Sequence, residues 1–238
     1  MIYVAPRAGA WNLLRRPADP AAARAAEPDL LLTGEHPLSP TSFSPAGDRL
    51  ALTEVRPDSR GDILILPVAP GGRAGDPRPF LRTPADEWGA AFSPDGRFVS
   101  YTSNATGRNE VFVTPFAVAG QGDAAAESGA AGAIQVSRDG GYGPIWTRDG
   151  RELVFRSGDA VLAVPVRLRP SFAAGTPAIL FRGPYDGASA GWANYDLAPD
   201  GRRFVMIRGR DDAGATRRLD LVLGFTEELR RAVARGQE

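Results

Sequence analysis

A serine between glycines has the spacing that most directly suggests covalent chemistry. Residues Gly187-Ala188-Ser189-Ala190-Gly191 match the G-x-S-x-G pattern, in which a strand-to-helix turn presents a nucleophilic serine and a histidine base follows later in the chain. The sequence holds one histidine, His36, far upstream of Ser189. We therefore expect Ser189 to lie in a loop between repeats, and we predict no catalytic residue.

The same histidine is the first candidate for a metal ligand. His36 stands between Glu35 and Pro37, but a metal site needs several convergent ligands, and a lone imidazole more often pairs locally. The chain has no cysteine, and its 28 basic residues are all arginine. Cysteine nucleophiles, cysteine zinc sites, Schiff-base lysines and phosphate-loop lysines are thereby excluded, and we expect neither a metal nor a cofactor.

Charge and hydropathy argue against two further classes of partner. The arginines are balanced by 28 acidic residues, so the chain lacks the net positive charge that favours nucleic acid or an anionic membrane. No apolar run approaches the roughly 20 residues that span a bilayer, and residues 1–16 lack the pattern of a signal peptide. We predict no nucleic-acid partner and no membrane span in this chain, while the compartment stays undetermined.

A turn motif that returns four times indicates which elements position the loops. It ends in a glycine, at Gly47, Gly96, Gly150 and Gly201. The period of about 50 residues is in the range of propeller blades. Bulky residues stand three and five positions after each glycine, which predicts a buried middle strand. The turn acids Asp95, Asp149 and Asp200 suit turn formation better than a calcium site or an acid catalyst.

Two more strands follow each turn hairpin. Residues 63–68, 111–116 and 161–166 predict third strands, and residues 79–81, 134–136 and 179–181 predict short fourth strands. Four strands per repeat are typical of β-propeller blades, which hide their faces by stacking on their neighbours. The sequence therefore predicts an all-β fold, an incomplete β-propeller with about three full blades and two partial ones.

The predicted propeller is a single domain over residues 1–238. It consists of a partial blade at 1–34, whole blades at 38–83, 88–137 and 143–183, and a partial last blade with a short C-terminal helix at 193–238. In the first partial blade, we expect residues 2–6 to form a third strand and residues 30–32 a fourth.

Loops that join successive blades gather on one face of a propeller. Mixed aromatic, acidic and arginine side chains there suit recognition of a protein or peptide. The candidate partner-binding residues are Glu35, His36, Asp86, Glu87, Trp88, Asn104, Arg108, Asn109, Arg138, Tyr142, Tyr185, Asp186, Trp192 and Asn194. The alternative for Trp88 and Trp192 is that they fill gaps between blades.

The repeats resemble the WD-like propeller repeats of the TolB type. The segments that carry the resemblance are TGEHPLSPTSFSPAGDRLALTE, SNATGRNEVFVTPF, TRDGRELVFRSGDAVLAVPV and NYDLAPDGRRFVMI. They look like the C-terminal propeller of bacterial proteins with a serine/threonine kinase domain upstream. This resemblance covers residues 2 to 231 and implies a sensor, scaffold or gate within a longer protein. The glycine-rich loop and ATP-binding lysine of a kinase are missing from the sequence itself.

These observations lead us to expect a non-catalytic binding or scaffold module, not an enzyme, that engages a protein or peptide through its loop face. An incomplete ring exposes a blade surface, so we also expect self-association or a separate chain that completes the propeller. One alternative is the sensory propeller of a transmembrane serine/threonine kinase. A further alternative is the propeller of a prolyl oligopeptidase-type hydrolase.

Overall fold

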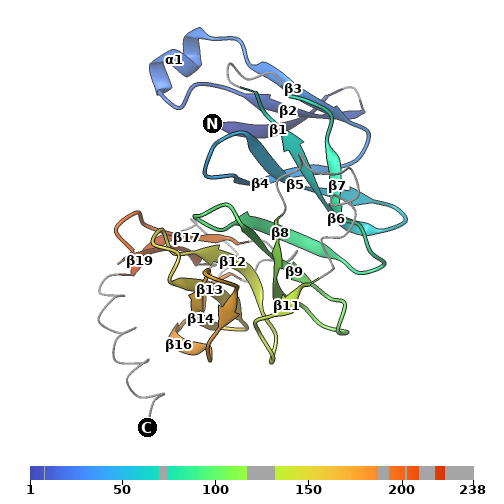
Figure 1. Ribbon diagram of the computed structural model, residues 1–238. Coiled ribbons are helices and arrows are strands. Elements are labelled where there is room, and N and C mark those ends of the chain that lie inside the picture. The colour runs from blue at the N-terminus through green and yellow to red at the C-terminus, as the bar shows by residue number, and fades with distance from the viewer. Residues whose placement is uncertain are drawn as a thin grey trace.

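The computed structural model contains five antiparallel sheets that follow one another along the chain as propeller blades (Figure 1). It describes residues 1–7, 9–69, 74–116, 132–186, 193–201 and 203–208, and the backbone of 218–222. In chain order the sheets have three, four, four, five and three strands. The predicted all-β propeller with three whole and two partial blades is therefore confirmed. Ser189, Trp192 and the predicted helix near the C-terminus lie outside the described residues.

The second and third blades are regular four-stranded sheets. The second contains β4 (Leu38–Phe43), β5 (Arg49–Arg56), β6 (Arg60–Pro67) and β7 (Arg78–Leu81). The third contains β8 (Glu87–Phe92), β9 (Phe98–Ser103), β10 (Glu110–Pro115) and β11 (Ile134–Gln135). Strands pair in chain order in both sheets, and every residue of β9 is buried. The predicted middle strand is confirmed, because a strand inside a sheet that is itself covered on both faces meets no solvent.

The fourth and fifth blades depart from this pattern at their outer edges. The fourth contains β12 (Tyr142–Trp146), β13 (Glu152–Ser157), β14 (Ala160–Arg167) and β16 (Ala178–Arg182), with β15 (Ala173–Ala174) paired to the end of β14. The fifth contains β17 (Tyr195–Leu197), β18 (Phe204–Arg208) and β19 (Arg218–Val222). Its described part therefore ends at a third strand.

The turns between first and second strands repeat in detail. Gly96 has a φ of 70°, a left-handed conformation that glycine adopts without steric cost. The Asp95 carboxylate accepts hydrogen bonds from the Ser93 hydroxyl at 2.8 Å and from the Arg97 amide at 3.2 Å. Asp149 accepts the same two bonds in the next blade. The assignment of these two acids to turn formation is confirmed.

Each of these turns also touches the turn of the preceding blade. A Cβ atom added to Gly96 would lie 3.5 Å from Cδ of Pro45, and one added to Gly150 would lie 3.7 Å from Cγ of Pro94. Both distances are ordinary van der Waals contacts. The turns of the second, third and fourth blades consequently form a stepped row in which glycine meets the previous proline.

The first blade has three strands, β1 (Ile2–Arg7), β2 (Ala10–Arg15) and β3 (Asp29–Gly34), with the short helix α1 (Pro20–Ala25) before β3 (Figure 1). The expectation that residues 2–6 form a third strand is wrong. They form the second, because the apolar β2 supplies the third and β3 leads into the next blade as β7 does. Among the described residues, no helix is long and apolar enough to cross a membrane.

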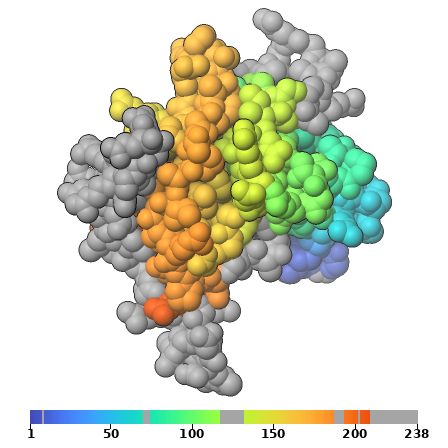
Figure 2. Space-filling model, turned by 90° about the horizontal axis from the view of Figure 1, so that it is seen from below, coloured from blue at the N-terminus to red at the C-terminus, as the bar shows by residue number. Residues whose placement is uncertain are grey.

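The apolar core lies between neighbouring blades. One cluster joins Ile63 and Phe80 of the second blade to Phe92 and Tyr101 of the third. Another joins the third blade to the fourth around Phe155, which is 1% exposed. Figure 2 shows the result, with the blades side by side in sequence order from orange through green to blue. Each sheet is therefore stabilised chiefly by its neighbours, and the innermost strands are held at fixed positions around the axis.

Candidate functional site

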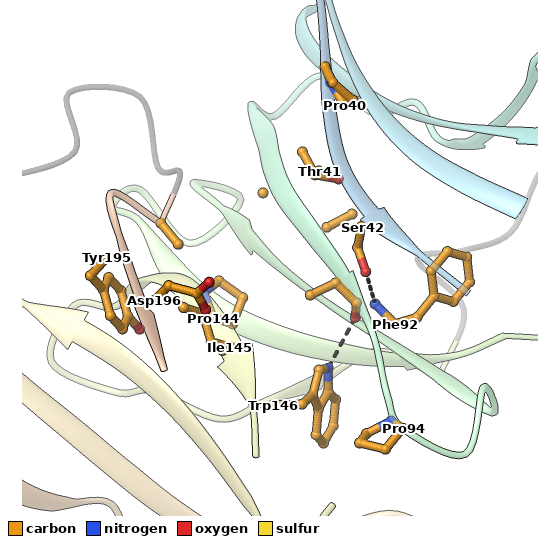
Figure 3. A pocket seen from close by; sticks show the side chains of 14 residues that line it. Pro40, Thr41, Ser42, Phe92, Pro94, Pro144, Ile145, Trp146, Tyr195 and Asp196 are labelled. Carbon is orange, nitrogen blue, oxygen red and sulfur yellow. Dashed lines mark hydrogen bonds between the residues drawn. The ribbon is translucent and has the colours of Figure 1, made fainter. Parts of the chain in front are cut away.

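The innermost strands of four blades line an open cavity of about 470 Å³ (Figure 3). Its lining comes from β4, β8, β12 and β17 and from residues beside them: Pro40, Thr41, Ser42, Gly89, Ala90, Ala91, Phe92, Pro94, Pro144, Ile145, Trp146, Ala193, Tyr195 and Asp196. We call this cavity the central channel. Concave sites of this size are where small ligands usually bind.

Two hydrogen bonds tie the lining strands of different sheets together (Figure 3). The amide of Phe92 donates to the Ser42 hydroxyl oxygen at 3.1 Å and so joins β8 to β4. The indole Nε1–H of Trp146 donates to the Ala91 carbonyl at 3.0 Å and joins β12 to β8. Because these bonds cross between blades, the channel wall is fixed by more than apolar packing.

The wall is formed mainly by small or uncharged side chains. Gly89, Ala90 and Ala91 line one side, and the Thr41 hydroxyl donates to a backbone carbonyl at 3.1 Å. Asp196 is the charged residue among the described lining residues. Its side chain is exposed, and Oδ1 accepts from the Leu197 amide at 2.8 Å. A carboxylate in an otherwise neutral cavity favours a ligand with a positive charge.

Beside Asp196, Tyr195 is a fixed and neutral part of the wall. Its hydroxyl donates to the Gly143 carbonyl at 2.8 Å. Burial raises the pKa of the Tyr195 phenol far above its ordinary value, although the positive charge of Arg156 opposes this shift. The phenol therefore stays protonated and acts as a structural donor.

The described residues contain no group of three or more histidine, cysteine or acidic side chains that could hold a metal ion. The expectation that the chain takes no metal and no cofactor stays a prediction. Ser189, whose sequence matches a nucleophile pattern, lies outside the described residues.

The structure brings several predicted partner-binding residues together at the junction of the second and third blades. The Asp86 amide donates to Asn104 Oδ1 at 2.8 Å, and Asn104 Nδ2 donates to Asp86 Oδ2 at 2.9 Å. Arg60 also pairs with Asp86 at 3.3 Å. Glu87 lies next to this cluster, but it is only 2% exposed and cannot touch a partner without rearrangement. Trp88 packs close to Gly61, as expected for a residue that fills a gap between blades.

A second cluster lies at the junction of the third and fourth blades. Arg108 donates to the buried Glu110 carboxylate at 2.7 Å and also to the Arg138 carbonyl. The Asn109 carbonyl accepts from the Gly141 amide at 2.9 Å. These predicted residues therefore share one junction, where much of their hydrogen bonding is internal to the protein.

A third cluster surrounds a buried arginine between the fourth and fifth blades. Arg156 is 1% exposed, and its guanidinium lies 5.6 Å from the centre of the Tyr142 ring. It donates to the carbonyls of Tyr185 and Asp186 and to Oδ1 of Asn194. Four of the candidate partner-binding residues, Tyr142, Tyr185, Asp186 and Asn194, are thus held together at this junction. Glu35 and His36, between β3 and β4, make none of these contacts.

In the part of the chain that the structure describes, three buried charged residues are absent from the sequence-based candidates: Asp62, Glu110 and Arg156. Asp62 and Glu110 occupy equivalent positions near the start of β6 and β10 and are 0% and 1% exposed. An acid immediately before an apolar third strand in two repeats was the available signal. Arg156 stands where Thr53 and Thr102 stand in the two preceding repeats, so its departure from the repeat could have marked it.

Comparison with known proteins gives a fold rather than a family. No protein-family profile matches the sequence, and no curated protein matches it significantly. Among solved structures, TolB from Acinetobacter baumannii is 15% identical with a TM-score of 0.64, and the match covers 94% of this chain and 50% of that one. The chain thus spans half the length of that TolB. It has a TolB-type β-propeller fold.

Two enzymes have the same fold over most of this chain. The periplasmic gluconolactonase PpgL from Pseudomonas aeruginosa is 17% identical with a TM-score of 0.55, covering 92% of this chain and 65% of that one. A puromycin hydrolase, as its S511A mutant complexed with PGG, is 18% identical with a TM-score of 0.57, covering 90% of this chain and 31% of that one.

These neighbours overturn the expectation of a non-catalytic scaffold that is not an enzyme. That expectation treated a TolB-type propeller as a sign of a binding module alone, but the fold is shared with a lactonase and a hydrolase. The reason is general, because one fold can support unrelated chemistries through the residues placed on it. Function must therefore be argued from the central channel.

Proposed function

We propose that this chain is the propeller part of a larger hydrolase-type enzyme and that its central channel admits a small substrate that bears a positive charge. The observation that carries this proposal is the channel itself, about 470 Å³ in volume, with a neutral wall and the single described carboxylate of Asp196. A charged group that enters such a cavity loses part of its hydration shell. A fixed opposite charge in the wall compensates for this loss, so the cavity selects ligands of that charge.

The fold match with the puromycin hydrolase supports the first half of the proposal. The part of the hydrolase that matches this chain is 31% of the hydrolase's length. The small residues Gly89, Ala90 and Ala91 support the second half, because their short side chains leave room for a ligand beside β8. An extended peptide with a free amino group has both the charge and the hydrogen-bonding groups that this wall accommodates.

Binding of a charged probe and of its neutral acetylated form tests the channel. Phenylalaninamide carries a free ammonium group, whereas N-acetylphenylalaninamide is neutral. We expect calorimetry to show tighter binding of the ammonium probe and Asp196→Asn to weaken that binding at least fivefold. The matched control is Asp159→Asn, which changes an exposed acid paired with Arg182 outside the channel and leaves affinity unchanged. Equal binding of both probes, or an unaffected Asp196→Asn variant, would refute the proposal.

A regulatory propeller of a transmembrane serine/threonine kinase is the second candidate. The sequence resemblance of blades two to five to kinase-linked propellers favours it. The gene around this chain discriminates between the two candidates. We expect the same reading frame to encode a hydrolase domain with a nucleophilic serine beside this chain. A kinase domain with a membrane span in that frame would instead favour the second candidate.

A further inference from the structure

A second cavity, of about 410 Å³, lies between the third and fourth blades, at the end of the sheets that carries the hairpin turns. Its third-blade wall includes Phe98 of β9 opposite Pro115 of β10, and Val113 of β10 opposite Ile134 of β11. Residues that lie directly opposite each other in an antiparallel pair project from the same face of the sheet. These four side chains therefore form one apolar surface, which we call, with the fourth-blade loop opposite it, the turn-side pocket.

The fourth-blade wall of the turn-side pocket is the loop between β14 and β15. Phe172 anchors this loop, because its ring is only 8% exposed and lies 5.5 Å from the ring of Phe98 and 6.3 Å from that of Trp146. Pro170 and Ser171 complete the wall and are exposed. The pocket is thus formed where two blades meet, and a buried aromatic ring fixes its second side.

Arg97 is the charged residue among the described lining residues of the pocket. Its side chain is exposed, and it reaches across to the fourth blade, where Nη1 donates to the Leu168 carbonyl at 3.0 Å and Nη2 to the Pro170 carbonyl at 3.4 Å. The guanidinium also lies 5.5 Å from the centre of the Phe98 ring. The two hydrogen bonds use two of its five N–H groups, so the cation is held at the pocket with donors left for an anion.

The equivalent arginine of the next turn is held differently. Arg151 pairs with the turn acid Asp149 at 3.8 Å, whereas Asp95 accepts from the backbone amide of Arg97 and not from its guanidinium. The described contacts of that guanidinium are two carbonyls and a ring, so its positive charge has no carboxylate partner among the described residues. A charge of this kind beside an apolar wall favours a ligand with a carboxylate and an apolar body.

We propose that the turn-side pocket binds a small aromatic carboxylic acid. The planar guanidinium of Arg97 matches a carboxylate, and the rings of Phe98 and Phe116 in the lining suit edge-to-face contact with an aromatic ring. A volume of about 410 Å³ is in the range of small-ligand sites. The pocket shares no described lining residue with the central channel, and this inference does not depend on the hydrolase proposal.

Three probes separate the contributions of charge and ring. 3-Phenylpropionate is an anion at pH 7, 3-phenylpropionamide has nearly the same shape without the charge, and propionate has the charge without the ring. We expect calorimetry on the full chain to show that phenylpropionate binds at least fivefold more tightly than the amide, because only the acid forms charge-assisted hydrogen bonds. Propionate should bind at least tenfold more weakly than phenylpropionate, because it buries no ring.

Replacement of the cation tests its role. Arg97→Gln should lower the affinity for phenylpropionate at least fivefold, to that of the amide, while affinity for the amide stays within twofold of the parent chain. The matched control is Arg151→Gln, which removes the equivalent turn arginine, paired with Asp149 and outside the pocket. This control should leave both affinities unchanged.

A second position separates charge from structure, because Arg97 also holds the fourth-blade loop. Ile134 is 42% exposed in the pocket lining, so a polar side chain there leaves the core intact. Ile134→Glu should bind phenylpropionate at least fivefold more weakly than Ile134→Gln does, since the added carboxylate repels the anion. Both variants should bind the amide equally. Circular dichroism checks that all variants are folded.

Three outcomes would overturn the proposal. The first is equal binding of phenylpropionate and its amide, or no binding of either at millimolar concentration. The second is an affinity for phenylpropionate that neither Arg97→Gln nor Ile134→Glu changes, which would place the acid elsewhere on the chain. The third is much tighter binding of a short peptide that ends in a free phenylalanine carboxylate, which would assign the pocket to a peptide C-terminus instead of a small acid.

Discussion

Two junctions between blades place a buried acid at the same position and treat it differently. At the junction of the third and fourth blades, the Glu110 carboxylate accepts from Arg108, from the Ser137 hydroxyl and from the Gly140 amide. At the junction of the second and third blades, Asp62 accepts from Ser59 and Arg82. The other oxygen of Asp62 has no hydrogen-bond partner among the described residues.

The electrostatic surroundings explain the contrast. Around Glu110 the donors include an arginine, a hydroxyl and a backbone amide, so the negative charge is well compensated. Near Asp62 lies a second buried acid, Glu87, whose pKa is raised to about 7 by burial, with the nearby negative charge of Asp62 adding to the shift. Equivalent positions in two blades therefore place a carboxyl group at the same point, but the surrounding residues decide how well its negative charge is stabilised.

Removal of Glu110 should have the largest effect. Glu110→Ala leaves the buried Ser137 hydroxyl and the Gly140 amide without an acceptor, and we expect a loss of about 3 to 5 kcal/mol in the free energy of unfolding. Thermal unfolding should show a fall in Tm of about 10 °C for a chain of this size. Glu110→Gln keeps one acceptor and should lose roughly half as much. A Tm within 2 °C of the parent for Glu110→Ala would show that the compensated junction is not the stronger one.

A steric change at the other junction should have the next largest effect. A Cβ on Gly61 would lie 2.8 Å from the Glu87 carbonyl oxygen and 2.8 Å from Cε2 of Trp88. Gly61→Ala should therefore push the second and third blades apart and lower the free energy of unfolding by roughly 2 to 3 kcal/mol. Urea unfolding measures this, with Gly75→Ala as the control, because Gly75 also has no positive φ and a Cβ added there would meet its nearest neighbour, Pro67, only at 3.4 Å. Equal losses in both variants would contradict the packing argument.

The pH dependence of stability should distinguish the junctions further. The pKa of Glu87 is about 7 in the folded chain and lies near its ordinary value of 4.5 in the unfolded chain. Protonation therefore favours the folded state, and the resulting stability is present below pH 4.5 and is lost as pH rises to about 7. Glu87→Gln should remove this dependence and stabilise the chain at pH 8 by on the order of 1 to 2 kcal/mol.

Urea unfolding at pH 5 and pH 8 gives the measurement. Glu152 is a matched control, because burial, with Asp149 adding to the effect, raises its pKa to about 7 as well, yet it lies in the fourth blade. Glu152→Gln should leave the contribution of Glu87 in place. If Glu87→Gln destabilised the chain equally at both pH values, the raised pKa would not be the cause.

The smallest effect is expected at the edge of the less compensated junction. Asn104→Ala removes the two side-chain hydrogen bonds with Asp86, which lies at a half-buried position. We expect the free energy of unfolding to fall by about 0.5 to 1 kcal/mol, as measured by the same urea unfolding. The control is Thr106→Ala, on the exposed part of that loop. A loss as large as that of Gly61→Ala would mean that these bonds, not packing, hold the junction.

The turn glycines and the apolar third strands were sufficient to predict the blades, because both signals are local. The β1 assignment failed because residues 2–6 carry the same apolar pattern as a third strand, and only pairing shows that β2 takes that place. The channel could not be predicted, since its wall combines strands separated by about 50 residues. Asp196 follows Tyr195 on a short strand whose sequence does not distinguish the channel side from the outer side.

The contacts between successive turns have a consequence for the size of the ring. Gly96 lies against the ring of Pro45, and Gly150 lies against the ring of Pro94, so these contacts set the separation of neighbouring turns. The angle by which each blade is rotated from the last depends on that separation. A methyl group at Gly96 would just touch Pro45, whereas a larger side chain would widen the wedge between the two blades, and the curvature of the row, which sets how many blades make a full circle, would change with it.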